Sequence, residues 1–571
     1  MRLSRQENLD RARRLLDEHQ EVLSSFHLRT VTMGFNLFDS ISSDIQAMAA
    51  NASARLSREL PAFQNAITET IQEVFGGLTN PAGLPYLQTR RAAVTPLETL
   101  TRAAVASGGA TSNDIVKFAA AIDLTVRQFL GQDSQGKPNP GQNVFLGGAG
   151  FLADRGISAD RQTYIDALPN ILTTTQIFNV NITVGSTHSG IFLDSVRAAA
   201  KITQQVGAND IQVTAQKVPN PADPSTWRLT SDEKATFANG QANIRSKWPS
   251  ATAAPFFSNL ARLAVFVNAP QENPFMAGGF AGLETPMRTI SVGINGAGVV
   301  AAAIRAAQSS SINDIIDSVK LYAGHMYVVA EAVRFEVIAK MRDAGFPVGE
   351  ADGVVDLSVA ATSDRAADGT PTNSIADAMA ALGVQAGAHG SVAATGMIID
   401  NLKKIGSGAI AYAGGLSGTF IPISEDAGMA DAVRQGWLTY PRFLSMTAVC
   451  SVGVDMFIAY WPQNLSQDDF RAHIGGMLLD EMAIGIYTNK TTSSRVIPIP
   501  WAPKTDFWAV LMGGAGLLGN APIMDLQFGT LPAPAALLNL SGALPAAITS
   551  FRNKRCRCVG EKKMSLTSRA A

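Results

Sequence analysis

The stretch from Val265 to Asn295 constrains the fold most strongly, because one buried strand leads through an apolar loop directly into another. Residues 263–267 and 289–294 are short runs rich in β-branched side chains, which is typical of strands rather than helices. The intervening loop is apolar where a surface loop is normally polar. Its backbone-breaking residues are Pro274, Gly278, Gly279 and Gly282. We therefore expect a hairpin that packs inside the protein.

The composition indicates a large, extensively buried α/β core. Hydrophobic residues make up 46% of the 571 residues and charged residues only 16%, with 50 glycines. This balance is typical of α/β proteins whose strands are covered on both faces. The length allows either one large domain or two.

Charge and cysteine content exclude several classes of function. The net charge is -1, but residues 551–571 contain seven Lys or Arg and one acid, so the remainder sums to -7 (-1 minus +6). A mildly acidic body argues against nucleic-acid binding. Three cysteines (Cys450, Cys556 and Cys558) are too few for a disulfide framework. With no apolar leader and no run of about 18 apolar residues, we expect a cytoplasmic protein that does not bind membranes.

Helical and strand patterns alternate along the chain. Strands are expected at residues 28–33, 88–94, 144–147, 178–184, 263–267, 289–294, 353–359, 409–413, 447–452 and 496–499, with a further candidate at 384–388. Alternating elements give parallel strands with right-handed crossovers. Two five-stranded halves around a buried hairpin predict a ten-stranded α/β barrel; the alternative is two stacked α/β domains without a central loop.

Three regions are expected along the chain. Residues 1–525 form one barrel domain, within which residues 207–255 are polar and interrupted by prolines, so they are read as a surface insertion after a helix from Leu193 to about Gln205. Residues 526–571 turn Pro/Ala-rich and then basic, which predicts a poorly ordered tail.

Several long runs resemble a known family. They are HLRTVTMGFNLFD (27–39), NPFMAGGFAG (273–282), GGLSGTFIPISEDAGM (414–429), CSVGVDM (450–456), TNKTTSSRVIP (488–498) and GLLGNAPIM (516–524). Together they resemble the uncharacterised domain-of-unknown-function 711 family over about residues 10–525. The resemblance implies a ten-stranded barrel like those of pyruvate formate-lyase and anaerobic ribonucleotide reductase, with a loop inside it, and a homodimer. It implies no established activity.

The radical chemistry of those barrel enzymes is not supported by this sequence. In them a cysteine on the inner loop carries a thiyl radical and a C-terminal glycine carries a glycyl radical. Here the loop has no cysteine, and the nearest run resembling the glycyl motif, Arg495 to Pro498, has proline in place of glycine. Fold resemblance alone does not assign a function.

Glu425 lies in Ser424-Glu425-Asp426, at the start of a predicted helix. It is a candidate catalytic acid, since Gly415 and Ser417 in the preceding glycine-rich run allow a ligand to approach the backbone. The alternative is structural: Ser424 is the N-cap and the two acids interact favourably with the helix dipole.

Gly296 and Gly298 fit a G-x-G-x-x-A pattern between a strand and a helix, so their amides are candidates for anion binding. A dinucleotide-binding fold would need a second strand that ends in an acid about 20 residues on, which is absent. Close helix packing is the alternative explanation for these glycines.

Cys450 and His389 are candidate catalytic residues with opposite surroundings. Cys450 lies in an apolar run, where cysteine is usually a small hydrophobe. His389 follows a possible strand, at the kind of position where α/β folds collect catalytic groups, although local backbone contacts would equally explain it.

Polar residues in apolar surroundings complete the candidate site. Burying such groups without partners costs about 2 kcal/mol or more, so they should contact cations, donors or one another. The candidate acids are Asp356 and Asp455, and the expected ligand-binding residues are Asn268, Glu272, Asn273, Lys490 and Arg495. An ion-pair network with no ligand is the alternative.

Together these patterns favour a non-radical enzyme that acts on a small polar or anionic metabolite inside the barrel. The alternative is a metabolite-binding or regulatory protein that kept the barrel without its chemistry. The sequence identifies no cofactor, no metal, and neither substrate nor reaction.

Overall fold

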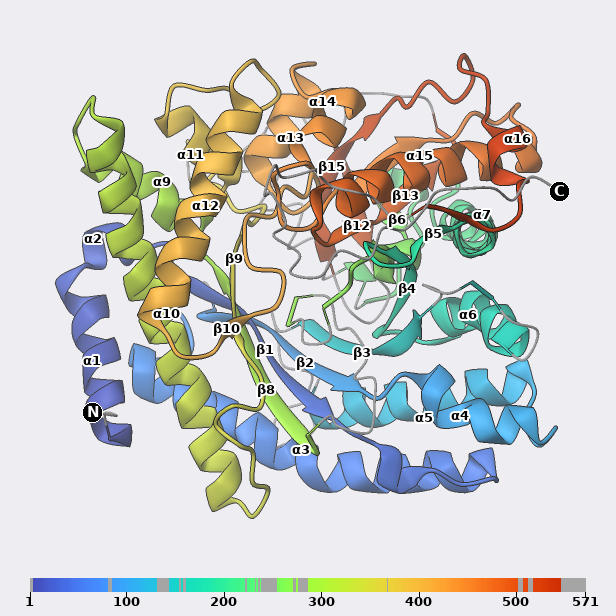
Figure 1. The fold of residues 1–571 in the computed structure, drawn as a ribbon, viewed down its shortest axis with the longest axis horizontal. Coiled ribbons are helices and arrows are strands. Elements are labelled where there is room, and N and C mark those ends of the chain that lie inside the picture. Colours follow the sequence, from blue (N-terminus) through green and yellow to red (C-terminus); the bar gives the residue numbers. More distant parts are fainter. Residues whose placement is uncertain are drawn as a thin grey trace, which may run out of the picture.

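The computed structural model describes residues 4–80, 85–130, 143–152, 156–157, 161–220, 223–231, 233–234, 237, 254–270, 274–275, 286–366, 368–501, 507–511 and 517–545. Figure 1 shows strands at the centre of the molecule and helices around them. This layering explains why the strands read as nearly continuous apolar runs, since their two faces are both covered.

The large sheet contains two sets of parallel strands that run in opposite directions. The first set, in spatial order, is β1 (His27–Phe35), β2 (Leu87–Val94), β3 (Asn143–Leu152), β4 (Phe178–Ser186) and β7 (Leu263–Val267). The second set is β8 (Arg288–Asn295), β9 (Val355–Ala360) and β10 (Ala413–Gly414). β1 is antiparallel to β8, and β7 is antiparallel to β12 (Thr492–Ser494). The N-terminal ends of the first set therefore meet the C-terminal ends of the second.

A second sheet lies toward the C-terminal part of the chain. Its order is β13 (Val496–Ile499), β11 (Phe457–Tyr460), β15 (Leu517–Met524), β14 (Phe507–Leu511) and β6 (Ala254–Phe257). On the large sheet, β5 (Gly190–Phe192) pairs with β4 and with β16 (Ala543–Leu544). The structure is thus a mixed α/β fold with two sheets.

Backbone hydrogen bonds continue from β9 toward β12 through segments that are not regular strands. Val359 N donates to Gly418 O (2.9 Å), and Ser451 N donates to Thr419 O (3.1 Å). Ser493 N then donates to Val452 O (2.5 Å). The assigned strands of the large sheet nevertheless form an open path, with β10 at one end.

The helices cover the outside of the sheets (Figure 1). They are α1 (Arg5–Glu18), α2 (Gln20–Leu23), α3 (Ile45–Phe75), α4 (Leu97–Ala106), α5 (Ser112–Leu130), α6 (Gln162–Thr174), α7 (Leu193–Lys217), α9 (Ala297–Ala306), α10 (Ile312–Asp343), α11 (Ile375–Ala381), α12 (Ser391–Ala409), α13 (Ala427–Arg434), α14 (Tyr440–Met446), α15 (Gln467–Thr488) and α16 (Ala535–Leu538). Short 3₁₀ turns are η1 (Phe38–Ser40), η3 (Pro224–Thr226) and η4 (Leu260–Arg262). Polar caps define several helix starts: Ser4, for example, forms a capping box with Glu7.

The predicted central hairpin is wrong. β7 and β8 flank the loop as expected, but β7 pairs with β4 and β12 whereas β8 pairs with β1 and β9. The two strands are close in sequence but do not pair with each other, because β7 belongs to the first set of parallel strands and β8 to the second. The loop residues Pro274 and Phe275 are buried, and Thr32 Oγ1 donates to Pro274 O (3.0 Å). The inward position expected for the loop therefore holds for these two residues.

Other differences concern short or polar segments. Residues 447–452 and 384–388 form turns rather than strands. The helix expected to end near Gln205 continues to Lys217, because Asp210 and Thr214 are buried and contact the chain around Asn259 and Phe257. Residues 207–217 are thus part of a core helix. The first part of the expected tail contains α16 and β16, while residues 546–571 lie outside the described residues.

Arg262 joins three elements at one end of the first set of strands. The buried guanidinium donates to the carbonyl oxygens of Leu172, Thr175 (2.9 Å) and Phe178 (2.9 Å). It also donates to Asn259 Oδ1 (2.6 Å). These contacts fix the end of α6 and the starts of β4 and β7, so Arg262 substitutes for backbone pairing where those segments meet.

We expect Arg262→Met to lower the free energy of unfolding by about 3 kcal/mol or more, because several buried carbonyls lose their donor. Urea denaturation measures the change. Arg102→Met is the matched control, since Arg102 is exposed and pairs only with Glu98, and it should cost less than about 1 kcal/mol. Equal effects of the two substitutions would contradict the structural role of Arg262.

Candidate functional site

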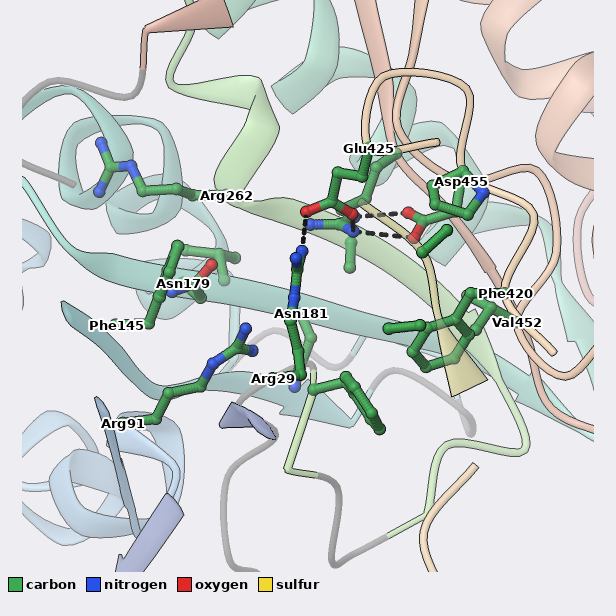
Figure 2. Close-up of a pocket in the computed structure, with 17 residues that line it drawn as sticks. Arg29, Arg91, Phe145, Asn179, Asn181, Arg262, Phe420, Glu425, Val452 and Asp455 are labelled. Carbon is green, nitrogen blue, oxygen red and sulfur yellow. Dashed lines mark hydrogen bonds and ion pairs between the residues drawn. The ribbon is translucent and has the colours of Figure 1, made fainter. Parts of the chain in front are cut away.

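A cavity of about 710 Å³, including its open mouth, lies inside the large sheet where the two sets of strands meet. Figure 2 shows the side chains that line it. They are Arg29, Arg91, Phe145, Asn179, Val180, Asn181, Arg262, Ala264, Phe275, Ala360, Ala361, Phe420, Pro422, Glu425, Val452, Asp455 and Arg495.

A chain of ion pairs runs along one wall of the cavity. Arg29 Nη2 donates to Glu425 Oε1, and Arg495 Nη2 lies 3.6 Å from the other carboxylate oxygen, Glu425 Oε2. Arg495 also binds Asp455 through two parallel hydrogen bonds, Nε to Oδ1 (2.5 Å) and Nη2 to Oδ2 (2.8 Å). The order Arg29, Glu425, Arg495, Asp455 balances two positive charges against two negative ones.

Burial and neighbouring charges shift the pKa values within this chain of ion pairs. Burial raises the pKa of Asp455, and the adjacent Arg495 offsets part of that effect. Burial alone would lower the pKa of Arg495, but its contacts with Asp455 outweigh burial and raise it. Arg495 therefore remains charged, and its two hydrogen bonds favour the ionised form of Asp455.

Arg91 is a buried cation without an acidic partner. Its side chain is 6% exposed, and no carboxylate among the described residues lies within 4 Å of its guanidinium. Nε donates to Thr89 Oγ1 (3.1 Å), and the guanidinium lies over the Phe145 ring, 4.7 Å from its centroid. Burial lowers the pKa of Arg91 to about 9, and the positive charge of Arg29 contributes. Arg91 is still protonated at neutral pH, so the cavity has an excess positive charge at this point.

Side chains alternate between the two faces of a strand, and this alternation directs several polar residues into the cavity. Thr89 and Arg91 are two residues apart and share one face of β2, while Arg90 points to the opposite face and donates to Thr68 Oγ1 on α3 (3.0 Å). Asn179 and Asn181 alternate in the same way on β4. The register between β1 and β8 shifts between Leu28 and Thr30, so Arg29 lies at an irregularity of the kind that redirects a side chain.

Asn181 adds an unused amide to the polar end. Asn179 donates to Leu146 O (3.3 Å) and Ile177 O (3.0 Å), which orients its side chain. Asn181 lines the cavity without a hydrogen-bond partner among the described residues. Arg91 and Asn181 thus both have donors free for a ligand.

The opposite side of the cavity is apolar. Phe275, Ala360, Leu416, Phe420 and Val452 form a hydrophobic cluster separate from the main core. The rings of Phe275 and Phe420 meet edge to face, with centroids 4.6 Å apart. Figure 2 shows Phe420 and Val452 on the side away from Arg91 and Asn179. The cavity is therefore polar at one end and apolar at the other.

Glu425 is held by the start of α13. Asp426, rather than the expected Ser424, is the N-cap, and it accepts hydrogen bonds from Gly428 N (2.9 Å) and Met429 N (3.1 Å). Asp426 also accepts from Ile375 N (2.8 Å), so it fixes this loop against α11. Burial raises the pKa of Asp426 to about 6. With Asp426 occupied by backbone amides, Glu425 is the acid that faces the cavity.

Asp356, Gly415 and Ser417 form a local structural unit outside the cavity. The buried Asp356 carboxylate accepts from Ser358 N (2.8 Å), Leu416 N (2.7 Å) and Ser417 N (2.9 Å). A Cβ at Gly415 would lie 2.3 Å from Asp356 Oδ2, and Gly415 has a positive φ of 72°, so only glycine fits there. These contacts indicate a turn held by a carboxylate.

Cys450 and Lys490 form a second group. Cys450 is buried, and Lys490 Nζ lies 3.8 Å from its Sγ. Lys490 Nζ also donates to the carbonyl oxygens of Thr447 and Cys450, just beyond the end of α14. Neither residue lines the cavity. The lysine is therefore placed to cap a helix, where cations are favourable.

The remaining predicted site residues are dispersed. Asn268 has a positive φ of 51°, and its side chain binds Thr187 N (2.7 Å) and Lys490 O (2.9 Å). Gly298 N donates to Asn373 Oδ1 (2.7 Å), and a Cβ at Gly298 would lie 2.4 Å from Thr372 O, so Gly296 and Gly298 start a closely packed helix. His389 is exposed in a turn between α11 and α12 and does not line the cavity. Glu272 and Asn273 lie outside the described residues.

The structure therefore brings together Glu425, Asp455 and Arg495 from the predicted set. The sequence reasoning missed Arg29, Arg91, Asn179, Asn181, Phe275 and Phe420. One signal was available: Arg29 and Arg91 are charged residues within segments that were predicted to be buried strands. Among the described residues, no cluster of three or more His, Cys, Asp or Glu side chains is arranged to hold a metal ion. None of the helices formed by those same residues is both long enough and apolar enough to cross a membrane.

Glu481 on α15 supports the segment that carries Asp455. It is fully buried, and its Oε1 accepts from Val454 N (2.7 Å). Burial raises the pKa of Glu481 from 4.5 to about 8, although the Val454 amide and the Ser494 hydroxyl oppose the shift. At neutral pH the folded protein therefore retains a proton that the unfolded chain has lost.

This proton predicts a pH dependence of stability. Between pH 4.5 and about 8, the free energy of unfolding should fall by roughly 1.4 kcal/mol per pH unit through Glu481, with the full contribution present below pH 4.5. Glu481→Gln should remove this slope, measured by urea denaturation at pH 5, 6, 7 and 8. Asp400→Asn, on an exposed ion pair with Lys404, is the control. An unchanged slope in Glu481→Gln would contradict the assignment.

Comparisons with known proteins place the chain in a family. The family model described as Uncharacterised ACR (DUF711) matches residues 22–218 and 240–507. A UPF0210 protein of Ligilactobacillus salivarius is 32% identical over 527 residues, which cover 92% of this chain and 96% of the relative. A UPF0210 protein of Clostridium beijerinckii is 31% identical with the same coverage.

Among solved structures, an anaerobic ribonucleotide reductase has a TM-score of 0.43 at 8% identity, over 90% of this chain and 80% of that one. The anaerobic ribonucleotide reductase from Thermotoga maritima with citrate in the active site has a TM-score of 0.40 at 8% identity, over 86% of this chain and 87% of that one. The chain belongs to the DUF711 family of uncharacterised proteins.

Proposed function

We propose that the protein is an enzyme that binds a small anionic metabolite in the cavity through Arg91 and transfers a proton through Glu425. The observation that carries the proposal is the buried Arg91 guanidinium, which has no carboxylate partner among the described residues. A charge held away from water is costly unless it is paired. A carboxylate or phosphate group of a ligand supplies the missing partner.

The hydrogen bonding of Arg91 favours a role in ligand binding over a purely structural role. Its Nε is used by Thr89, so the remaining guanidinium donors are available to an anion. Bidentate binding is the usual geometry of arginine with carboxylates and phosphates. The amide of Asn181 supplies a further donor on the neighbouring wall. The ligand-binding end of the cavity is therefore Arg91 and Asn181.

Glu425 is suited to proton transfer because its two oxygens have different partners. Oε1 accepts from Arg29, and Oε2 lies 3.6 Å from Arg495. An anion on Arg91 competes for Arg29 as well, which loosens the contact at Oε1 and leaves that oxygen accessible to the ligand. Asp455 holds Arg495 by two hydrogen bonds, so it is a positioning residue. The proposed reaction class is proton abstraction next to a bound carboxylate, without radical chemistry: a C–H bond breaks, the proton goes to Glu425, and the electron pair is delocalised onto the carboxylate that Arg91 binds.

The proposal includes a barrel around the cavity. The hydrogen bonds Val359 to Gly418, Ser451 to Thr419 and Ser493 to Val452 support a ring of ten segments that ends at β12. Residues 1–525 would form that barrel. A cytoplasmic homodimer is proposed on the low cysteine content and the family resemblance, and light scattering of the purified protein tests the dimer.

A non-catalytic metabolite-binding protein is the second candidate function. One observation favours it: both acids of the cavity are already in ion pairs with arginine, and these contacts occupy the carboxylate oxygens that would act on a ligand. In this case the ligand would change stability or assembly and would not be converted.

Arg91→Gln tests the binding site. We expect thermal-shift screening of the wild type against a library of metabolites to identify stabilising carboxylates or phosphates, and Arg91→Gln to abolish that stabilisation. Arg90→Gln is the matched control, because Arg90 is the adjacent residue on the other face of β2. Equal stabilisation of Arg91→Gln and wild type would refute the anion site.

Glu425→Gln separates the two candidate functions. For an enzyme, the ligand still binds this variant but product formation, followed by mass spectrometry, falls by about 100-fold or more. Conversion by wild type with no loss in Glu425→Gln would exclude Glu425 as the base. Binding by wild type without any conversion favours the non-catalytic function.

A further inference from the structure

We infer that the ligand is a monoanion with a short branched apolar body, such as a branched-chain aliphatic carboxylate. The inference rests on the proposed function and adds the chemical class of the ligand. It follows from the division of the cavity into a cationic end at Arg91 and an apolar end at Phe275, Phe420 and Val452.

The positive end has room for one anionic group. Of the cavity arginines, Arg29 and Arg495 are paired with Glu425 and Asp455. Arg262 is bound to backbone carbonyls. Arg262 also lacks a carboxylate partner, but both of its Nη atoms already donate to carbonyl oxygens. Among the described residues, Arg91 is the cavity arginine whose Nη donors are unused, so it can bind one negatively charged group at that end.

The apolar end disfavours a second charge. Phe275, Phe420 and Val452 are 7%, 6% and 1% exposed, and the described residues of their cluster include no donor side chain and no cation. A second carboxylate placed there would lose its hydration without gaining a partner. Methyl and methylene groups would instead gain contacts with the two rings and with the Val452 side chain. The edge-to-face pair of Phe275 and Phe420 leaves an angular surface, which suits a branched body better than a planar one.

The middle of the cavity places the reactive part of such a ligand. In Figure 2 the side chain of Arg29 lies between Arg91 and Phe420 and points to Glu425, which lies toward the top of the view. A carboxylate on Arg91 and a branched chain against Phe420 therefore put the intervening carbon beside Arg29, whose ion-pair partner Glu425 also lines the cavity. In a branched-chain acid this carbon is adjacent to the carboxylate, the position at which the proposed proton transfer acts.

Isothermal titration calorimetry with four compounds tests the inference on the full-length protein. Acetate provides the anion alone, isovalerate adds the branched body, isovaleramide removes the charge and succinate adds a second charge. Each buried methylene is worth a factor of about four in affinity, so we expect isovalerate to bind at least 10-fold more tightly than acetate. Isovaleramide and succinate should both bind at least 10-fold more weakly than isovalerate.

Two variants locate the contacts. Val452→Thr keeps the side-chain volume but adds a hydroxyl, and should weaken isovalerate several-fold while leaving acetate unchanged. Val392→Thr, at an exposed position on α12, is the control and should change neither. Arg91→Gln should weaken all the anions.

The outcomes separate this inference from the function on which it rests. Anions that bind wild type but not Arg91→Gln, with acetate or succinate as tight as isovalerate, would overturn the branched-chain inference and keep the anion site. Isovalerate binding that Val452→Thr does not weaken would also overturn it. If none of the anions binds wild type at millimolar concentration, both the inference and the anion site fail.

Discussion

The chain of ion pairs from Arg29 through Glu425 and Arg495 to Asp455 is the interaction on which the site depends. Its members come from β1, from the loop before α13, from the segment between β12 and β13, and from the turn before β11. Four distant parts of the sequence therefore meet at one wall of the cavity. Because each charge is buried and paired, the removal of any one leaves its neighbour uncompensated, which is costly in such surroundings. Because the four charges along this wall cancel, neither of its two acids is left to neutralise Arg91.

The antiparallel arrangement of the two strand sets explains why charged and apolar groups share one cavity. The first set contributes residues from within its strands, such as Arg91, Asn179 and Asn181, whereas the second contributes residues at or beyond its strand ends, such as Ala360 and Phe420. Their meeting produces a space that is cationic on one side and apolar on the other, with Phe275 entering from the loop after β7.

Sequence patterns predicted the local structure better than the site. Strands such as β1, β4 and β8 were recognisable because burial on both faces requires continuous apolar, β-branched runs. The pairing of β7 with β8 was predicted wrongly, since nearness in sequence says little about partners in a sheet of crossovers. Asp455 was expected to contact a cation, a donor or another buried polar group, and its partner is the cation Arg495. Arg91 was missed because what matters is the absence of an acid near it. That absence depends on how β2 packs beside β3 and on where Glu425 lies in the folded chain. Asp356 shows the converse: an acid in an apolar strand was a reasonable candidate, yet backbone amides satisfy it fully.

The central claim is that the surplus charge of Arg91 requires an anion. The most direct measurement is an anomalous difference map from crystals in which bromide replaces other anions, collected near the bromine absorption edge. We expect a peak within hydrogen-bond distance of the Arg91 guanidinium in the wild type and none at this position in Arg91→Gln. A wild-type map with bromide peaks elsewhere but none at Arg91, at a resolution that shows ordered water in the cavity, would contradict it.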